Sequence, residues 1–166
     1  MIALKNILVA TDFSPASDAA LVYGRALART FGATLHLLHV IENTFLTPMA
    51  DDPYNLRVAS ARSLQRQLTA EDREVLHARI AMEVSDSPPD AIVDYAKSAN
   101  IDLIVVGTHG RGAMSQLLVV SVAERVVRTA PCPVLTVRHP EHEFVVPDVP
   151  EMRGSHDCPQ EDSRRH

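Results

Sequence analysis

One short stretch, residues 101–106, restricts the fold of this chain more than any other. Its sequence, Ile-Asp-Leu-Ile-Val-Val, is almost continuously apolar and runs into a cluster of glycines that begins at Gly107. A run of this kind lacks the alternation of a half-exposed strand and is typical of a strand buried on both faces. Such strands belong to parallel sheets that carry helices on both sides, so the stretch predicts an α/β protein.

Further apolar runs and amphipathic segments follow one another in the order that such a sheet requires. Ser14 and Pro15 form a helix start, and Gly32 is placed to end the same helix. We expect strands at residues 6–12, 33–41, 79–84, 101–106 and 134–137, and helices at residues 15–31, 56–75, 91–98 and 122–129. This alternation predicts a five-stranded, parallel, doubly wound, Rossmann-like sheet in a single domain.

The helical periodicity also predicts which side chains face the core. We expect Leu64, Leu68 and Val75 to point inward from one helix, and Val122, Val126 and Val127 from the last one. The sequence Ser-Pro-Pro-Asp at residues 87–90 is expected to form a turn before a helix that starts at residue 91.

The predicted domain occupies residues 1–138, and the composition changes after it. Residues 139–166 combine prolines with acidic and polar residues and contain no apolar pattern. A segment of this composition cannot bury enough apolar surface to fold, so we expect a disordered polar tail.

Composition and charge argue against several functions. The net charge is −5, so a nucleic-acid groove has no electrostatic support, and neither Lys5 nor Lys97 lies in a P-loop pattern. No apolar stretch has the length of a membrane helix or a secretory signal. Cys132 and Cys158 are far apart in the sequence and differ in context, so we expect no disulfide framework, which fits a reducing compartment. We therefore expect a cytoplasmic protein with neither nucleic-acid nor membrane partners.

A candidate anion site follows the central apolar run. Gly107, Gly110 and Gly112 leave the backbone free to adopt positive φ and to approach another group closely, as phosphate binding at the carboxyl edge of a sheet requires. Ser121 and Glu124 form a capping box, which predicts a helix that begins at Val122 with its free N–H groups toward the loop. Glycine loops after strands also occur as simple turns, so the loop alone does not decide the function.

Asp12 is a second candidate, since it lies at the carboxyl end of the first strand, where open α/β sheets place ligand contacts. The alternative is a local role, because a carboxylate near a helix start accepts backbone N–H bonds. His36 and His39 are three apart in a strand, so we expect them on opposite faces, in structural roles rather than as ligands of one metal ion. No zinc signature occurs in the chain, and the expected metal is at most a Mg²⁺ that accompanies a nucleotide.

With these parts placed, residues 1–138 resemble the universal stress protein (UspA-like) family. The resemblance is carried by three blocks: Ile7-Leu8-Val9-Ala10-Thr11-Asp12; Asp102-Leu103-Ile104-Val105-Val106-Gly107-Thr108-His109-Gly110-Arg111-Gly112; and Ser121-Val122-Ala123-Glu124-Arg125-Val126, which leads to Ala130-Pro131-Cys132-Pro133-Val134-Leu135. Several ordered blocks in one chain are far more specific than the glycine loop alone.

The resemblance implies a site for ATP or AMP. Family members that bind ATP share the motif G-x2-G-x9-G-[ST], and the chain matches it except that Val120 replaces the third glycine. By resemblance, Asp12 would contact the ribose or adenine side, Val40 would meet adenine through its backbone, and Arg111 would add charge. The complete set of implied nucleotide-binding residues is Ala10, Thr11, Asp12, Val40, Gly107, Gly110, Arg111, Val120, Ser121 and Val122.

Val120 separates two functions that this resemblance allows. Its branched side chain stands where the backbone must approach the phosphates, and valine tolerates positive φ badly. If the position needs only ordinary φ, the N–H groups at the helix start still offer an anion site. The chain is then an ATP-binding or AMP-binding regulatory module of a stress response; otherwise it is a scaffold of the same fold that binds no nucleotide.

Both functions involve a homodimer, which the resemblance implies is formed through the last strand, residues 134–137. The exposed edge of such a strand needs cover in any case. An enzyme is a third possibility, but no Ser-His-Asp set, Cys-His set or carboxylate pair has a supporting spacing, so we expect no enzymatic activity.

Overall fold

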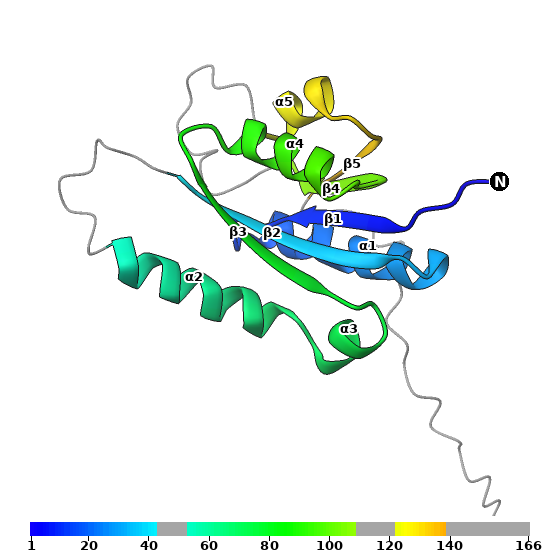
Figure 1. Cartoon of the computed structure of the whole chain (residues 1–166), viewed down its shortest axis with the longest axis horizontal. Helices are drawn as coiled ribbons and strands as arrows, with labels where there is room; N and C mark the ends of the chain where they lie inside the picture. Colours follow the sequence, from blue (N-terminus) through cyan, green and yellow to red (C-terminus); the bar gives the residue numbers. More distant parts are fainter. Residues whose placement is uncertain (43–52, 109–121, 139–166) are drawn as a thin grey trace, which may run out of the picture.

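The computed structural model of this chain describes residues 1–42, 53–108 and 122–138 (Figure 1). Five parallel strands form one sheet in the order β3-β2-β1-β4-β5, which confirms the predicted α/β fold. The strands are β1 (Asn6–Ala10), β2 (Thr34–Glu42), β3 (Arg79–Ser85), β4 (Leu103–Gly107) and β5 (Val134–Val137); the helices are α1 (Pro15–Phe31), α2 (Pro53–Gln67), α3 (Ala70–Glu74), α4 (Pro88–Ser98) and α5 (Val122–Thr129). The predicted tail, residues 139–166, lies outside the described residues.

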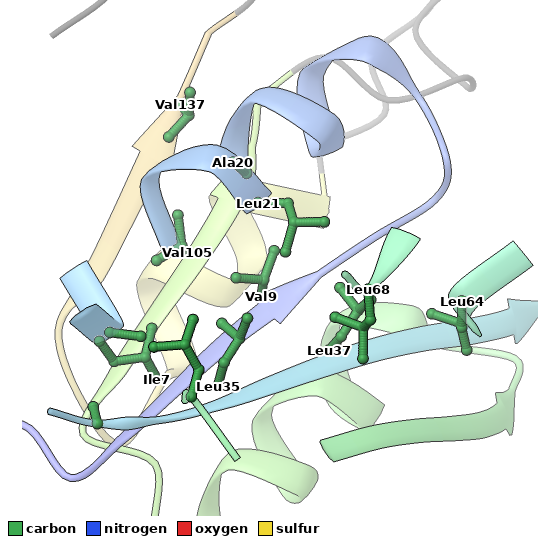
Figure 2. Packing of buried hydrophobic residues seen from close by; sticks show 13 residues of the cluster. Ile7, Val9, Ala20, Leu21, Leu35, Leu37, Leu64, Leu68, Val105 and Val137 are labelled. Atoms are coloured by element: carbon green, nitrogen blue, oxygen red, sulfur yellow. The ribbon is translucent and has the colours of Figure 1, made fainter. Parts of the chain in front are cut away.

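Helices cover both faces of the sheet, with α1, α2 and α3 on one side and α4 and α5 on the other (Figure 1). Successive side chains of a strand point to opposite faces, and β1 shows the result. Ile7 and Val9 pack in the cluster on the α1 side, whereas Leu8 packs in the cluster on the α4 side. Figure 2 shows the α1 side, where Leu21 lies against Val9. The centre of β1 is therefore buried from both faces, as a strand inside a parallel sheet must be.

Helix α1 begins and ends at the predicted residues. The Ser14 hydroxyl accepts the Ser17 N–H at 3.3 Å, and Pro15 occupies the first turn, where no N–H is needed. Gly32 ends the helix in the left-handed conformation with φ of 62°. A Cβ on Gly24 would lie 2.3 Å from Val9 Cγ2, so this glycine lets α1 pack directly on β1.

The helix predicted at residues 56–75 is two helices, α2 and α3. Thr69 starts α3 with a capping box: its hydroxyl accepts the Asp72 N–H at 3.1 Å, and its own N–H donates to Asp72 Oδ2 at 2.9 Å. These local bonds replace the continuation of α2. The prediction for Val75 was wrong, because the chain turns there and leaves that side chain 60% exposed, while Leu76 is buried in its place. Leu64 and Leu68 are buried as predicted.

The start of α4 and the inward face of α5 also differ from the prediction. Helix α4 starts at Pro88 rather than at residue 91, because the two prolines fit the first turn of a helix, where their missing N–H groups cost nothing. In α5, Val126 is buried as predicted, but Val122 and Val127 are 40% and 51% exposed. The inward face is centred on Ala123 and Val126, and at 100° per residue this places the two valines on its flanks.

A buried ion pair holds α3 against α1. Arg25 Nε lies 2.9 Å from both carboxylate oxygens of Asp72, and Arg25 also donates to the Gln67 carbonyl. The Asp72 side chain is fully buried, whereas that of Arg25 is 20% exposed. Burial raises the pKa of Asp72, but the hydrogen bonds from Arg25 and Thr69 and the charge of Arg25 outweigh it and leave that pKa below its ordinary value. Asp72 is therefore ionised, and its contacts with Arg25 stabilise the charged form of the carboxylate.

Asp72→Asn is expected to lower the free energy of unfolding by about 3 kcal/mol, because it leaves the Arg25 guanidinium without its counter-charge in a largely buried position. Urea denaturation measures this loss. Glu71→Gln is the matched control, since Glu71 lies on the same helix and pairs with Arg29 at 2.7 Å in solvent, where a pair contributes less than about 1 kcal/mol. Equal losses in the two variants would contradict the assigned role of the buried pair.

Candidate functional site

The carboxyl ends of β1 and β4 form a topological switch point. From β1 the chain crosses to β2 through α1 on one face, whereas it reaches β4 from β3 through α4 on the other face. In open α/β sheets the crevice for ligands lies at such a point. The segments that follow the two strands, Thr11 to Ser14 and Thr108, therefore supply the walls of the candidate site, with the end of β2 beside them.

The turn between β1 and α1 is held by side chains that bond to its own backbone. Thr11 Oγ1 accepts the Phe13 N–H at 3.1 Å, and Asp12 Oδ1 accepts the Ser14 N–H at 3.0 Å. Phe13 lies in the left-handed region with φ of 61°, which costs a residue with a Cβ about 1–2 kcal/mol. The local role of Asp12, one of the two that the sequence leaves open, is therefore confirmed, and its role in ligand binding stays a prediction.

Two buried hydroxyl groups, those of Thr11 and Ser17, support this turn. Thr11 Oγ1 lies 3.1 Å from Ser17 Oγ, and the Ser17 hydroxyl donates to the Ser14 carbonyl at 2.9 Å. Their side chains are almost fully buried. These groups satisfy one another, so they fix the position of Thr11 and the start of α1.

His39 reaches from β2 onto the same turn. Its Nδ1 lies 2.8 Å from the Thr11 carbonyl oxygen, and because a carbonyl oxygen only accepts, Nδ1 carries the hydrogen and donates it. The imidazole ring lies against the Phe13 ring, with a centroid distance of 4.4 Å and an angle of 40° between the planes. The sequence indicated only a structural role for His39; no sequence signal predicts its contact with Thr11, because that contact depends on the left-handed turn at Phe13.

This contact changes how the backbone pairing of β1 and β2 ends. Thr34 N–H donates to the Lys5 carbonyl, and the Leu38 carbonyl accepts the Thr11 N–H at 2.8 Å, so the even-numbered residues of β2 direct their peptide groups toward β1. Val40 is the next even-numbered residue, and its N–H would donate to the Thr11 carbonyl if the ladder continued.

The ladder instead stops at the pair Ala10 and Leu38. Within the described part of the chain, the Thr11 carbonyl accepts from His39 and no bond joins it to Val40 N–H. In an extended strand the N–H and C=O of one residue point to the same side. Val40 therefore carries a donor and an acceptor side by side, directed past the end of β1 toward the switch point.

Gly107, at the end of β4, is in contact with α1. A Cβ at this position would lie 2.6 Å from the Ala16 carbonyl carbon and 2.7 Å from its oxygen. Gly107 thus approaches another group closely, but that group is the first turn of α1, and the predicted approach to a phosphate stays a prediction. Gly107 does not use the freedom to adopt positive φ; among the described glycines, Gly32 does. Gly107 is needed for packing whether or not a ligand binds.

The other predicted site residues fall into two groups. Ala10 ends β1 and is half-buried, and Val122 begins α5 as predicted, at the same edge of the sheet as Gly107. Gly110, Arg111, Val120 and Ser121 lie outside the described residues. The structure therefore brings the predicted site residues Ala10, Thr11, Asp12 and Val40 to the same edge of the sheet as Gly107 and Val122.

His36 belongs to the opposite face of the sheet, as predicted. Its Nδ1 lies 2.9 Å from the Tyr95 hydroxyl on α4, whereas His39 contacts Phe13, which packs in the cluster on the α1 side. Burial, and secondarily the charge of Arg79, lowers the pKa of His36 below its ordinary value, so the ring is neutral near pH 7. Across the segments that the structure describes, no group of three or more His, Cys, Asp or Glu residues could hold a metal ion. In the same segments, no helix has the length and apolar character to span a membrane.

Comparisons with known proteins agree with this architecture. The model of the Universal stress protein family matches residues 3–138. A universal stress protein of Thermus aquaticus is 34% identical over 140 residues, which cover 81% of this chain and 98% of the relative. The solved structure of universal stress protein UspA from Lactobacillus plantarum is 29% identical, covers 83% of this chain and 100% of its own, and superposes with a TM-score of 0.70. A universal stress protein solved in complex with cAMP shares the fold at 24% identity and a TM-score of 0.61, covering 82% of this chain and 98% of its own.

Gly107→Ala is expected to lower the free energy of unfolding by about 1–3 kcal/mol, because the added methyl group meets the rigid backbone of Ala16. Gly32→Ala is the comparison, since it meets no atom within 4 Å and strains only its own φ. Thermal and urea unfolding of the free protein measure both losses. Wild-type stability in Gly107→Ala, with an effect on ligand binding alone, would contradict the packing role.

Proposed function

The chain belongs to the universal stress protein family, and from this premise we propose that it is a cytoplasmic, adenine-nucleotide-binding regulatory module without enzymatic activity of its own. The observation that carries the proposal is the peptide edge of Val40. It offers a donor and an acceptor beyond the end of β1, at the switch point where ligands of open α/β sheets bind.

The chemistry of this edge matches adenine. Val40 N–H can donate to N1 of the base while the Val40 carbonyl accepts from the 6-amino group. Guanine presents N1–H and a 6-oxo group. Its N1–H donor would face the Val40 N–H donor, and its 6-oxo acceptor would face the Val40 carbonyl acceptor. A site built in this way rejects the wrong base because buried polar groups are left unpaired.

The sugar and the phosphates would lie along the same edge of the sheet. Asp12 stands at the turn that follows β1, next to the end of β2, and would contact the ribose from there. The N-terminus of α5 at Val122 favours an anion through its free N–H groups and its dipole. Gly110, Arg111 and Ser121 would complete the phosphate side with ATP or AMP, and a Mg²⁺ would accompany a bound triphosphate.

Val120 favours a second function, a dimeric scaffold of the same fold that binds no nucleotide. Valine stands where the family's ATP-binding motif has glycine, and a branched side chain at this position opposes a close approach of phosphate to the backbone. The scaffold would act through its dimer surface alone. Nucleotide affinity separates the two functions.

Titration with a fluorescent ATP analogue, competed by ATP, AMP, cAMP and GTP, tests the proposal. We expect adenine nucleotides to compete and GTP to fail. Val120→Gly is expected to tighten ATP binding by about 1–2 kcal/mol, or about 5- to 30-fold in Kd, because it removes side-chain bulk next to the phosphates. Asp12→Ala in the same background should weaken binding again, and Asp94→Ala, an exposed carboxylate on α4, should not.

Three outcomes have distinct meanings. Tight binding of ATP by the wild type that Val120→Gly does not change would refute the steric argument about Val120. Competition by GTP as strong as by ATP would refute base recognition by Val40. Failure of both wild type and Val120→Gly to bind any of the four nucleotides would refute nucleotide binding and leave the scaffold.

The homodimer is part of the proposal, and it is supported by the outer edge of β5, with which no other strand of the described segments pairs. Ile104 N–H donates to the Pro133 carbonyl and Thr108 N–H to the Val137 carbonyl, so the odd-numbered residues of this segment face β4. Thr136 consequently directs its N–H to the free edge. Beside that edge, Val127 of α5 is 51% exposed, on the flank opposite Arg125, which pairs with Asp90 of α4. A second copy pairing along β5 would cover both features.

Thr136→Pro is expected to shift the protein from dimer to monomer, because it removes an edge N–H without removing a bond to β4. Light scattering coupled to size exclusion measures the mass. Thr136→Val, which keeps the N–H, is the control and should remain dimeric. A dimeric, folded Thr136→Pro protein would rule out pairing through this edge.

A further inference from the structure

We propose that His39 is a positioning residue that keeps the peptide edge of Val40 open for the base, by occupying the carbonyl that would otherwise pair with it. The inference rests on the proposed function and adds a residue to its site. It follows from the competition of two donors, the His39 imidazole and the Val40 amide, for one acceptor, the Thr11 carbonyl.

The two donors correspond to two ways of ending the sheet. Thr11 N–H is already bonded to the Leu38 carbonyl at 2.8 Å, so Thr11 sits in register with β2 for one more ladder step. A bond from Val40 N–H to the Thr11 carbonyl would complete that step and close the edge. The structure has the imidazole there instead, with Nδ1 at 2.8 Å from the oxygen. The ladder is therefore stopped one residue early by a side chain.

The turn that follows holds the imidazole in this position. Phe13 adopts a φ of 61°, which brings its ring to 4.4 Å from the His39 ring. The bond from Phe13 N–H to Thr11 Oγ1 stabilises that backbone, and Thr11 Oγ1 is fixed in turn by Ser17. A left-handed phenylalanine persists only where the surrounding contacts determine it, and strain of this kind gathers at functional sites.

Base selectivity is the expected consequence. While His39 holds the Thr11 carbonyl, Val40 offers both a donor and an acceptor, and of the two purine bases adenine complements the pair whereas guanine does not. With the ladder closed, Val40 keeps its carbonyl but loses its free N–H. Affinity for ATP should then fall, and affinity for GTP, which gains nothing from that N–H, should not.

Two substitutions separate the donor from the bulk of the ring. His39→Leu keeps an apolar side chain against Phe13 and removes the donor, while His39→Asn places an amide nitrogen where Nδ1 lies. In the nucleotide-free protein, hydrogen exchange of the Val40 amide is measured by NMR. In parallel, Kd is measured for ATP and GTP. Unfolding curves verify that both variants are folded.

For His39→Leu we expect Val40 amide exchange to slow at least about tenfold and ATP affinity to fall about tenfold, with GTP unchanged. His39→Asn should restore both quantities to within about threefold of the wild type. Unchanged Val40 exchange in His39→Leu, or failure of Asn to rescue, would overturn the inference and reduce His39 to a packing residue.

The failure of the proposed function is distinguishable from the failure of this inference. If the wild type binds no nucleotide, the proposed function fails, but slow Val40 exchange in His39→Leu would still establish that His39 keeps the edge open. If the wild type binds ATP and His39→Leu binds it equally well, the proposed function stands and the positioning role is refuted.

Discussion

The structure depends on the burial of β1 between two parallel neighbours and two layers of helices. Its central residues, Ile7, Leu8 and Val9, are fully buried, so β2 and β4 must satisfy their backbone groups. On the β2 side the ladder ends at Ala10, and the backbone just beyond is bonded by side chains: Thr11 Oγ1, Asp12 and His39. At the candidate site, hydrogen bonds from side chains to the backbone thus follow the last bonds between the strands, and this is why polar residues are found there.

Close packing of α1 imposes a second constraint on the same region. Gly24 allows the helix to approach β1, and Gly107 allows its first turn to approach the end of β4. Gly107 also matches a glycine of the family's ATP-binding motif, so one residue carries a structural requirement and a proposed ligand contact. Its presence is consequently no proof of nucleotide binding. The peptide edge of Val40 carries more weight, because the contacts between strands do not use it.

Much of the fold follows from local signals in the sequence. Helix α1 has a capping serine, a first-turn proline and a terminal glycine, and all three lie where the structure uses them. The apolar strands alternate with helices, which leaves few topologies other than a parallel sheet. Local patterns were insufficient at Thr69, where a capping box and the contact of Asp72 with the distant Arg25 divide one predicted helix in two.

For the site, the sequence by itself determined which residues stand at or near the carboxyl ends of the strands: Gly107 ends β4, Val40 lies two residues before the end of β2, and Asp12, predicted to end the first strand, lies two residues beyond β1. A strand end can be recognised from its own apolar run. Only the tertiary structure decided what those residues do there: that Gly107 faces α1, and that His39 takes the acceptor next to Val40. The reason is physical. These contacts join segments that no local pattern links, and they depend on a left-handed turn at Phe13 that the propensity of phenylalanine opposes.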